Sequence, residues 1–520
     1  MTSPALREPV VAHGSAAGRP DPARWWALGV LGLALLVVAV DATVLGLAMP
    51  FLSDELKPSP TQMLWIGDVY SFVIAGFLVS MGSLGDRIGR KKLLLTGAAA
   101  FGVLSLLAAY AATPAMLIAA RALMGVAGAT LMPSTLALIR NLFEDPRERS
   151  LALGTWGSAS MAGAALGPVL GGFLLEHFWW GSVFLINIPV MGALIVVGAR
   201  LLPESRNPAP GPWDTVSVLL SLVGMIGVVF AIKETAAYGF GAARTAAGVL
   251  GLGCLAAFVR RQLTIPEPLL NMRLFRNRGF TASVLADLLT VVGLSGLVFF
   301  LSQFLQMVQE RSALQAGLAE IPASVGAVVT GLLAGHAARR YSVRGVVAGS
   351  LAAIGVCLAA LVTVAPHTGY PLLGAVLLVV GMGAGFSFTV TADVILSAVP
   401  QENAGAASAV SETAYELGTA LGIAVLGSIV TGLYSGFAVP HGVPGALAAQ
   451  AEQSLPGAVE AAARLPGPTG DALLTAAQGA FSDGLRVACG VGAVLLLVAA
   501  AWAWRMLRGQ ELAGQVPSGR

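Results

Sequence analysis

The chain has 520 residues, of which 56% are hydrophobic and only 11% are charged, and its mean hydropathy is +0.80. Soluble domains carry about 25% charged residues, so this composition excludes a soluble protein and indicates an integral membrane protein. The net charge of +3 is too small to predict a nucleic-acid partner, and we expect none.

Apolar runs long enough to cross a bilayer recur along the chain, because about 20 helical residues span the hydrocarbon core. We expect an all-α fold with fourteen membrane helices near 25–49, 62–83, 93–112, 115–138, 150–175, 180–200, 214–233, 243–260, 280–308, 313–337, 343–365, 370–392, 405–436 and 485–505. The polar segment before the first run lacks the apolar core and cleavage site of a signal peptide, so the first helix is expected to stay in the membrane.

Basic residues lie mostly on one side of these helices. Most of the 30 Lys and Arg occur in the terminal segments and in every second connection. Cytoplasmic connections carry this excess in membrane proteins, so both termini are predicted to be cytoplasmic. The long connection 261–279 falls on the same side, whereas 437–483 is predicted outside, where short helical patterns indicate either a small ordered cap or a flexible linker.

Asp41 is the only charged residue of the first apolar run. A carboxylate near the middle of a bilayer costs about 3 kcal/mol even on the lenient insertion scale. Such a residue usually faces a cavity, where it binds a cation or carries a proton. The alternative is that a buried basic residue neutralises it.

Asp68 in the second helix and Arg121 in the fourth are further intramembrane charges. At about 1.5 Å per residue, Asp41, Asp68 and Arg121 lie roughly 21, 22 and 25 Å from the cytoplasmic ends of their helices. Contact between the three is therefore expected if their faces agree. We predict that Arg121 holds Asp41 in the charged form, and a separation beyond about 6 Å from both aspartates would contradict the pairing.

The connection between the second and third helices combines glycines with charged residues. Its candidate cytoplasmic gate consists of Gly82, Gly85, Asp86, Arg87, Gly89 and Arg90. Glycines allow a tight turn and a close helix approach, and the aspartate can accept amides of a following helix or pair with an arginine. The pattern resembles the signature loop of the major facilitator superfamily, although a cluster that only sets topology is the alternative.

A diverged copy of this loop, without the aspartate, occurs at 335–345. Repeated halves around a midplane site are the usual plan of transporters, so the copy predicts two six-helix halves with two helices inserted between them. The expected segments are a cytoplasmic N-terminal segment at 1–24, the first half at 25–200, the inserted helices and linker at 201–279, the second half at 280–506 and a cytoplasmic tail at 507–520.

Small residues repeat every four positions in the fifth helix. The residues concerned are Gly163, Gly167, Pro168, Gly171 and Gly172. One face of this helix is therefore expected to pack closely against a neighbour, with a bend at the proline. The series resembles the motif that distinguishes antiporters among drug-exporting facilitators, and generic tight packing is the alternative.

Glu412 and Glu416 are four residues apart and share a face of the thirteenth helix. Two carboxylates on a buried face repel each other when both are ionised, which suits proton uptake and release. A position of Glu412 in solvent near the cytoplasmic end is the alternative. Asp287 and Glu320 are secondary candidates for a cation site and a cavity rim.

Aromatic and methionine side chains are expected to line a substrate cavity, because ring faces attract organic cations. The candidates are Trp65, Tyr70, Trp156, Met161, Phe304, Phe388 and Tyr415.

Across nearly its whole length the sequence resembles the fourteen-helix drug:proton antiporters of the major facilitator superfamily, of the quaternary-ammonium exporter type. The matching positions are Asp41 with Thr43 and Pro50, Trp65 with Asp68 and Tyr70, the 82–92 loop, Arg121, the 163–172 series and 411–418. The resemblance implies proton or cation binding at Asp41 and Glu416 and proton coupling through Arg121. A further aspartate that some members carry in the tenth helix for divalent cations has no clear counterpart here.

The sequence therefore predicts a proton-coupled multidrug efflux antiporter of the bacterial inner membrane. Its expected partners are protons and lipophilic or quaternary ammonium cations, which it exports by alternating access, and we expect a monomer. A dedicated exporter of one endogenous metabolite or antibiotic is the alternative. We expect no enzyme activity, cofactor or metal site, because no phosphate-binding loop, metal-ligand cluster or nucleophile constellation occurs; the energy source is the proton gradient.

Overall fold

The computed structural model describes residues 22–207, 213–266, 268–363 and 368–509. Most of the expected segments 1–24 and 507–520 therefore fall outside the described residues. Within the described ranges the chain is helical and contains no strand.

Fourteen helices in the described part are long and apolar enough to cross a membrane, as the hydrophobic runs predict. The helices that form the spans and their extensions are α1 (Ala23–Leu56), α2 (Pro60–Ile88), α3 (Arg90–Ala109), α4 (Pro114–Leu142), α5 (Pro146–His177), α6 (Ser182–Leu185), α7 (Asn187–Leu201), α8 (Thr215–Tyr238), α9 (Ala242–Thr264), α10 (Arg278–Gln303), η2 (Phe304–Val308, a π-helical turn), α11 (Ala313–Ala319), α12 (Ile321–Tyr341), α13 (Val343–Leu361), α14 (Tyr370–Ser397), α15 (Ala404–Tyr434) and α18 (Gly467–Met506).

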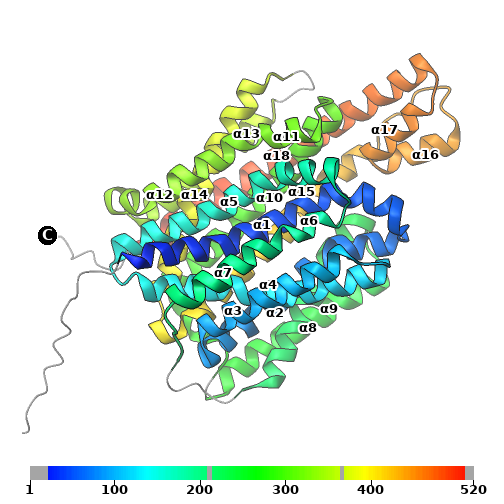
Figure 1. The fold of residues 1–520 in the computed structure, drawn as a ribbon. Helices are drawn as coiled ribbons and strands as arrows, with labels where there is room; N and C mark the ends of the chain where they lie inside the picture. Colours follow the sequence, from blue (N-terminus) through cyan, green and yellow to red (C-terminus); the bar gives the residue numbers. More distant parts are fainter. Residues whose placement is uncertain (1–21, 208–212, 267, 364–367, 510–520) are drawn as a thin grey trace, which may run out of the picture.

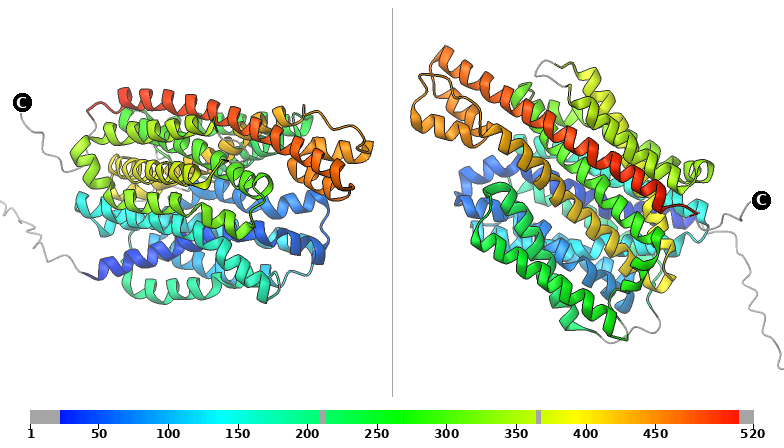
Figure 2. Two further views of the ribbon diagram at one scale, coloured as in Figure 1. Left: turned by 90° about the horizontal axis from the view of Figure 1, so that it is seen from above. Right: turned by 180° about the vertical axis from the view of Figure 1, so that it is seen from behind.

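The bundle contains two large hydrophobic cores, one in each half. One is built almost entirely from α1 to α7 and the other from α10 to α18. Helices α8 and α9 form a hairpin beside α2 at the edge of the bundle (Figure 1). Helix α1 begins and α18 ends at the same end of the bundle, which is called the terminal end below (Figure 2). The opposite end is called the far end.

The far end carries an ordered cap within the region 437–483. Helices α16 (Gly445–Gln453) and α17 (Leu455–Ala463) form this cap, which projects from the bundle (Figure 1). The Tyr434 hydroxyl at the end of α15 donates to the carbonyl oxygen of Ala451 at 2.9 Å. Of the two alternatives for this region, the structure therefore shows the ordered cap. The last membrane helix begins at Gly467 rather than near 485, because the final helical pattern of the region is continuous with it.

Two of the expected helices are broken. The expected helix 313–337 is divided at Glu320 into α11 and α12, and Pro322 stands at the start of α12, where a missing backbone donor costs least. The expected helix 180–200 contains the short α6 followed by α7. Gly89 joins α2 to α3 with φ of +112°, a conformation that glycine adopts without strain.

Candidate functional site

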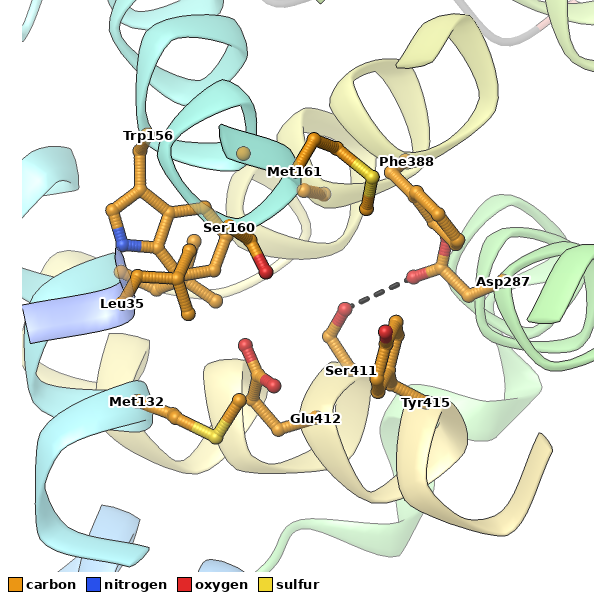
Figure 3. Close-up of a pocket in the computed structure, with 13 residues that line it drawn as sticks. Leu35, Met132, Trp156, Ser160, Met161, Asp287, Phe388, Ser411, Glu412 and Tyr415 are labelled. Carbon is orange, nitrogen blue, oxygen red and sulfur yellow. Dashed lines mark hydrogen bonds between the residues drawn. The ribbon is translucent and has the colours of Figure 1, made fainter. Parts of the chain in front are cut away.

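A cavity of about 100 Å³ lies between the two halves. Three helices of the first half (α1, α4, α5) and three of the second (α10, α14, α15) line it (Figure 3). The lining residues are Leu35, Met132, Leu136, Trp156, Gly157, Ser160, Met161, Asp287, Phe388, Ala392, Ser411, Glu412 and Tyr415. A site formed by both halves changes shape when the halves move against each other.

Two carboxyl groups face this cavity. Asp287, on α10, accepts hydrogen bonds from the Thr391 hydroxyl and, at 2.9 Å, from the Ser411 hydroxyl. Glu412, on α15, points its carboxyl group into the space between α15 and α5 (Figure 3). Glu412 is only 6% exposed, so the alternative of a solvated end position is wrong. Asp287, ranked as secondary from sequence, thus lies beside Glu412 in the same cavity.

None of the residues that line the described cavity is Lys or Arg. The two carboxyl groups therefore have hydroxyl groups or open space, rather than a fixed cation, as their nearest polar surroundings in this cavity. An uncompensated carboxylate in an apolar enclosure is costly, so each gains stability from a proton or from a bound cation.

Aromatic rings and thioethers form much of the remaining wall. Phe388 and Tyr415 contact each other with ring centroids 6.0 Å apart, and Trp156 donates its Nε1 proton to the Thr135 hydroxyl at 3.2 Å. Together with Met161 these are four of the expected cavity residues. Such a wall offers ring faces and polarisable sulfur to a lipophilic cation.

The other three expected cavity residues lie elsewhere. Trp65 stacks on Phe230 of the inserted helix α8 with centroids 6.0 Å apart. Tyr70 packs under the Arg121 guanidinium within the first half. Phe304 is fully buried in the second hydrophobic core, in the π-helical turn that follows α10. These three residues therefore do not line this cavity.

Asp41 and Arg121 form a buried ion pair inside the first half. Arg121 Nη1 lies 2.5 Å from Asp41 Oδ2, and the two side chains are each 2% exposed. Asn187 Nδ2 donates to Asp41 Oδ1 at 3.1 Å and to the Ser105 hydroxyl at 3.2 Å. The Arg121 carbon Cζ lies 4.4 Å from the centroid of the Tyr70 ring. Asp41 does not line the cavity, and a buried basic partner neutralises it.

Asp68 has a different partner from the one that helix depth indicates. Lys233 Nζ, on the inserted helix α8, lies 2.6 Å from Asp68 Oδ1. The expected helix 214–233 ends at Lys233, whereas α8 continues to Tyr238. Glu416 and Glu320 do not line the cavity; Glu416 is half-buried one turn beyond Glu412, and Glu320 stands at the break between α11 and α12.

At the terminal end, the gate residue Asp86 connects the two halves. Its carboxylate accepts the backbone N–H groups of Gly405 and Ala406, each at 3.1 Å, at the start of α15. Arg90 donates to Asp86 from Nε at 2.9 Å and to the carbonyl oxygen of Gln401 at 2.8 Å. The expected amide acceptance therefore occurs, but at a helix of the opposite half rather than at the next helix.

The other gate residues have distinct surroundings. Arg87 lies over the Trp213 ring, 5.4 Å from its centroid. A Cβ atom on Gly82 would lie 2.5 Å from the Gly405 carbonyl oxygen, so only glycine permits this crossing of α2 and α15. A Cβ on Gly85 would meet the Leu93 side chain at 3.3 Å.

A second buried pair joins the halves at the terminal end. Arg149, on α5, donates from Nε to Asp393 on α14 at 2.7 Å and from Nη2 to the Ser397 hydroxyl at 3.0 Å. Arg140 donates to the carbonyl oxygens of Leu396 and Val399. Sequence reasoning placed both arginines in a cytoplasmic connection and missed this contact. The signal available was the presence of Asp393 at the end of an apolar run.

Glycines set two close crossings of α5. Cβ atoms on Gly163, Gly167 and Gly171 would meet α1 at 2.5, 1.9 and 3.2 Å, whereas one on Gly172 would meet nothing within 4 Å. The four-residue spacing therefore marks the face toward α1, inside the first half. The Pro168 side chain lies outside the described part. Nearer the terminal end, a Cβ on Gly154 would lie 2.0 Å from the Gly331 carbonyl oxygen of α12, in the opposite half.

Two six-helix halves that meet around a central cavity and close together at one end define a membrane transport protein rather than an enzyme. The model of the Major Facilitator Superfamily matches residues 31–423. The chain belongs to this superfamily, within its drug-efflux branch.

Three relatives illustrate the branch. The chain is 46% identical to the multidrug efflux pump LfrA of Mycolicibacterium smegmatis, over 94% of this chain and 97% of that protein. It is 35% identical to the methyl viologen resistance protein SmvA of Salmonella typhimurium, over 92% and 98%. It is 34% identical to the puromycin resistance protein pur8 of Streptomyces alboniger, over 83% and 87%.

The fold is also similar to that of solved transporters. The crystal structure of the human organic anion transporter MFSD10 (TETRAN) matches with a TM-score of 0.58 at 15% identity, over 92% of this chain and all of that one. At this identity the similarity supports the fold alone.

Proposed function

We propose that the protein is a proton-coupled multidrug efflux antiporter that exports lipophilic and quaternary ammonium cations across a bacterial inner membrane. The terminal end faces the cytoplasm in this proposal, in agreement with the distribution of Lys and Arg. The observation that carries the proposal is the cavity between the halves, in which Asp287 and Glu412 face aromatic walls without a lining cation.

This cavity suits exchange of a drug for protons. A lipophilic cation gains ring contacts and a carboxylate partner on entry, while a proton neutralises the same carboxylate. Because both ligands neutralise the same groups, occupation by one weakens the binding of the other. One pH unit supplies about 1.4 kcal/mol per proton. The membrane potential supplies about 2.3 kcal/mol per net charge per 100 mV.

One relative supports a cationic substrate, and another supports a broad range of substrates. The name of SmvA specifies resistance to methyl viologen, a bipyridinium dication. The name of LfrA specifies multidrug efflux. Two carboxyl groups in one cavity would allow a dication to be neutralised without a further aspartate in the tenth membrane span, which consists of α11 and α12.

The test uses purified protein in liposomes with an imposed pH gradient and ethidium as the transported cation. We expect gradient-driven ethidium movement by the wild type and a loss of tenfold or more in Glu412→Gln. Glu452→Gln, which removes an exposed carboxyl group of the cap, is the matched control and should retain transport. Absence of gradient-driven movement in the wild type for ethidium and for quaternary ammonium compounds would refute the proposal.

A dedicated exporter of an antibiotic or other endogenous metabolite is the second candidate, and the similarity to pur8 favours it. A resistance panel in an efflux-deficient host separates the two functions. Protection against several unrelated cations supports multidrug export, whereas protection against one compound alone supports the dedicated exporter.

A further inference from the structure

The inserted hairpin α8–α9 contacts both halves of the transporter through α8. Val229 of α8 lies in one apolar cluster with Phe72 of α2 and Ala420 of α15. A Cβ atom on Gly76 of α2 would meet the α8 side chain of Leu222 at 2.8 Å. Because α2 and α15 belong to opposite halves, movement of the halves against each other changes the surroundings of α8.

Lys233 lies at this three-helix junction. Its Nζ atom is 2.6 Å from Asp68 Oδ1 on α2, and the two side chains are 20% and 35% exposed. The Phe72 ring lies one turn below Asp68 on α2, and its centroid is 5.1 Å from Nζ. The ammonium group thus has one anionic partner and one ring face, and it is neither fully buried nor freely solvated.

The charged groups around Lys233 belong to four helices. Asp68 lies on α2, Glu234 is its neighbour on α8, and Glu416 on α15 directly precedes Leu417, which packs against the apolar cluster of this junction. Arg244 stands near the start of α9, the helix that packs against α8. Lys233 therefore pairs with a carboxyl group of the first half, on a helix that also packs against α15, which carries Glu416 of the second half.

The depth of the pair places it toward the far end. Asp68 is eight residues from the start of α2 and Lys233 is five from the end of α8, which correspond to about 12 and 8 Å at 1.5 Å per residue. Protons and cations that approach from the far end therefore reach this pair before they reach the Asp41–Arg121 pair deeper in the first half.

We propose that Lys233 is a positioning residue, a tethered cation that occupies Asp68 while the terminal end is closed. A proton or a cationic substrate reaches Asp68 only by displacing the lysine, which then turns toward Glu416. The inserted hairpin thereby takes part in the transport cycle by linking a carboxyl group of each half. This inference rests on the proposed function for its transport readout, and its second readout is independent of transport.

The first measurement is the dependence of ethidium transport on the pH of the far-end compartment, for wild type, Lys233→Gln and Lys233→Arg. Without the lysine, no tethered cation competes with protons for Asp68, so the profile of Lys233→Gln should move to higher pH. Lys233→Arg keeps the charge and should keep the wild-type profile. Arg464→Gln, an exposed cation of the cap, controls for the loss of one far-end charge.

The second measurement is modification of Asp68 by a hydrophobic carbodiimide, which reacts with protonated carboxyl groups, followed by peptide mass spectrometry. At the same pH, Lys233→Gln should raise the modified fraction of Asp68 severalfold, and Lys233→Arg should not. This result stands even if the wild type moves no ethidium, in which case the proposed function alone fails.

A purely structural lysine would lower the thermal stability of Lys233→Gln and leave the pH profile and the modified fraction of Asp68 unchanged. That outcome overturns the inference. Equal effects of Lys233→Gln and Lys233→Arg would also overturn it, because the charge rather than the shape of the side chain is proposed to act.

Discussion

The buried pair of Asp41 and Arg121 gives a quantitative test of the first half. The change Asp41→Asn leaves the buried Arg121 guanidinium without the carboxylate that lies 2.5 Å away. Removing one partner of a buried ion pair typically costs about 3–5 kcal/mol, because the remaining charge is desolvated without compensation. We therefore expect Asp41→Asn to lower the free energy of unfolding by about that amount. The double variant Asp41→Asn/Arg121→Gln should be more stable than either single variant, because it buries no charge.

Equilibrium unfolding in mixed micelles measures the three variants against the wild type, with Glu452→Gln as the control for an exposed carboxyl group. A coupling energy of at least about 2 kcal/mol is expected, since contacting groups in one network are not additive. Additive losses in the double variant would show that the two charges do not depend on each other, and the reasoning would fail. A stable double variant that exports no ethidium would assign the pair a role in transport beyond stability.

Three further predictions concern the gates and the cavity. Gly154→Ala places a Cβ atom 2.0 Å from the Gly331 carbonyl oxygen, so we expect at least a tenfold loss of transport with retained folding, whereas Gly172→Ala on the same helix should be silent in the liposome assay. Asp86→Asn weakens the acceptor of two backbone N–H groups of the opposite half. Thiol reagents added from the terminal end should therefore label cysteines placed in the cavity severalfold faster. An unchanged labelling rate would show that this contact does not hold the terminal end closed. Glu412→Gln removes one of two cavity carboxyl groups, so binding of a dication should weaken about tenfold (about 1.4 kcal/mol) more than binding of ethidium, as fluorescence titration would report. Equal losses for both ligands would show that the second carboxyl group does not serve the dication.

The number of spans and the close-packing face of α5 could be predicted from the sequence for physical reasons. A span needs about 20 apolar residues whatever its neighbours are, so hydropathy counts it directly. Close helix approach requires small residues on one face, so the spacing of Gly163, Gly167 and Gly171 identifies that face without knowledge of the partner helix.

The partners of the charged residues could not be predicted in the same way. Lys233 and Arg149 stand near the ends of apolar runs, where helix ends read from sequence are uncertain by several residues. The expected helices therefore begin just after Arg149 and end at Lys233, although each residue lies within a helix and forms an ion pair across helices. Similar depth does place Asp41 near Arg121, but it cannot distinguish the helix face of Asp68, which turns toward α8 instead.

The sequence also does not show in which direction the aromatic side chains point. A membrane helix is apolar on the lipid side and on the protein side, so it lacks the polar face that orients a surface helix. Trp156 and Trp65 are equally plausible from sequence, yet one lines the cavity and the other stacks on α8. Ser411 and Asp287 come from helices far apart in the chain, and only the assembled second half brings them within 2.9 Å.

The placement of charges explains how closing the terminal end can depend on the cavity. Asp86 and Asp393 have partners across the halves at the terminal end, so these contacts stabilise the closed arrangement and are lost when it opens. Asp287 and Glu412 have no Lys or Arg among the described lining residues, so in the proposed cycle a proton or a bound cation neutralises them. The cavity contains the carboxyl groups whose charge changes, and its walls belong to both halves. A change of its occupant therefore alters the balance between closed and open arrangements. If the transporter reorients most slowly when the cavity is empty and both carboxyl groups are ionised, it exchanges its ligands rather than leaking them. At high external pH and without a bound cation, neither ligand neutralises the cavity. Transport is therefore expected to be slowest under these conditions.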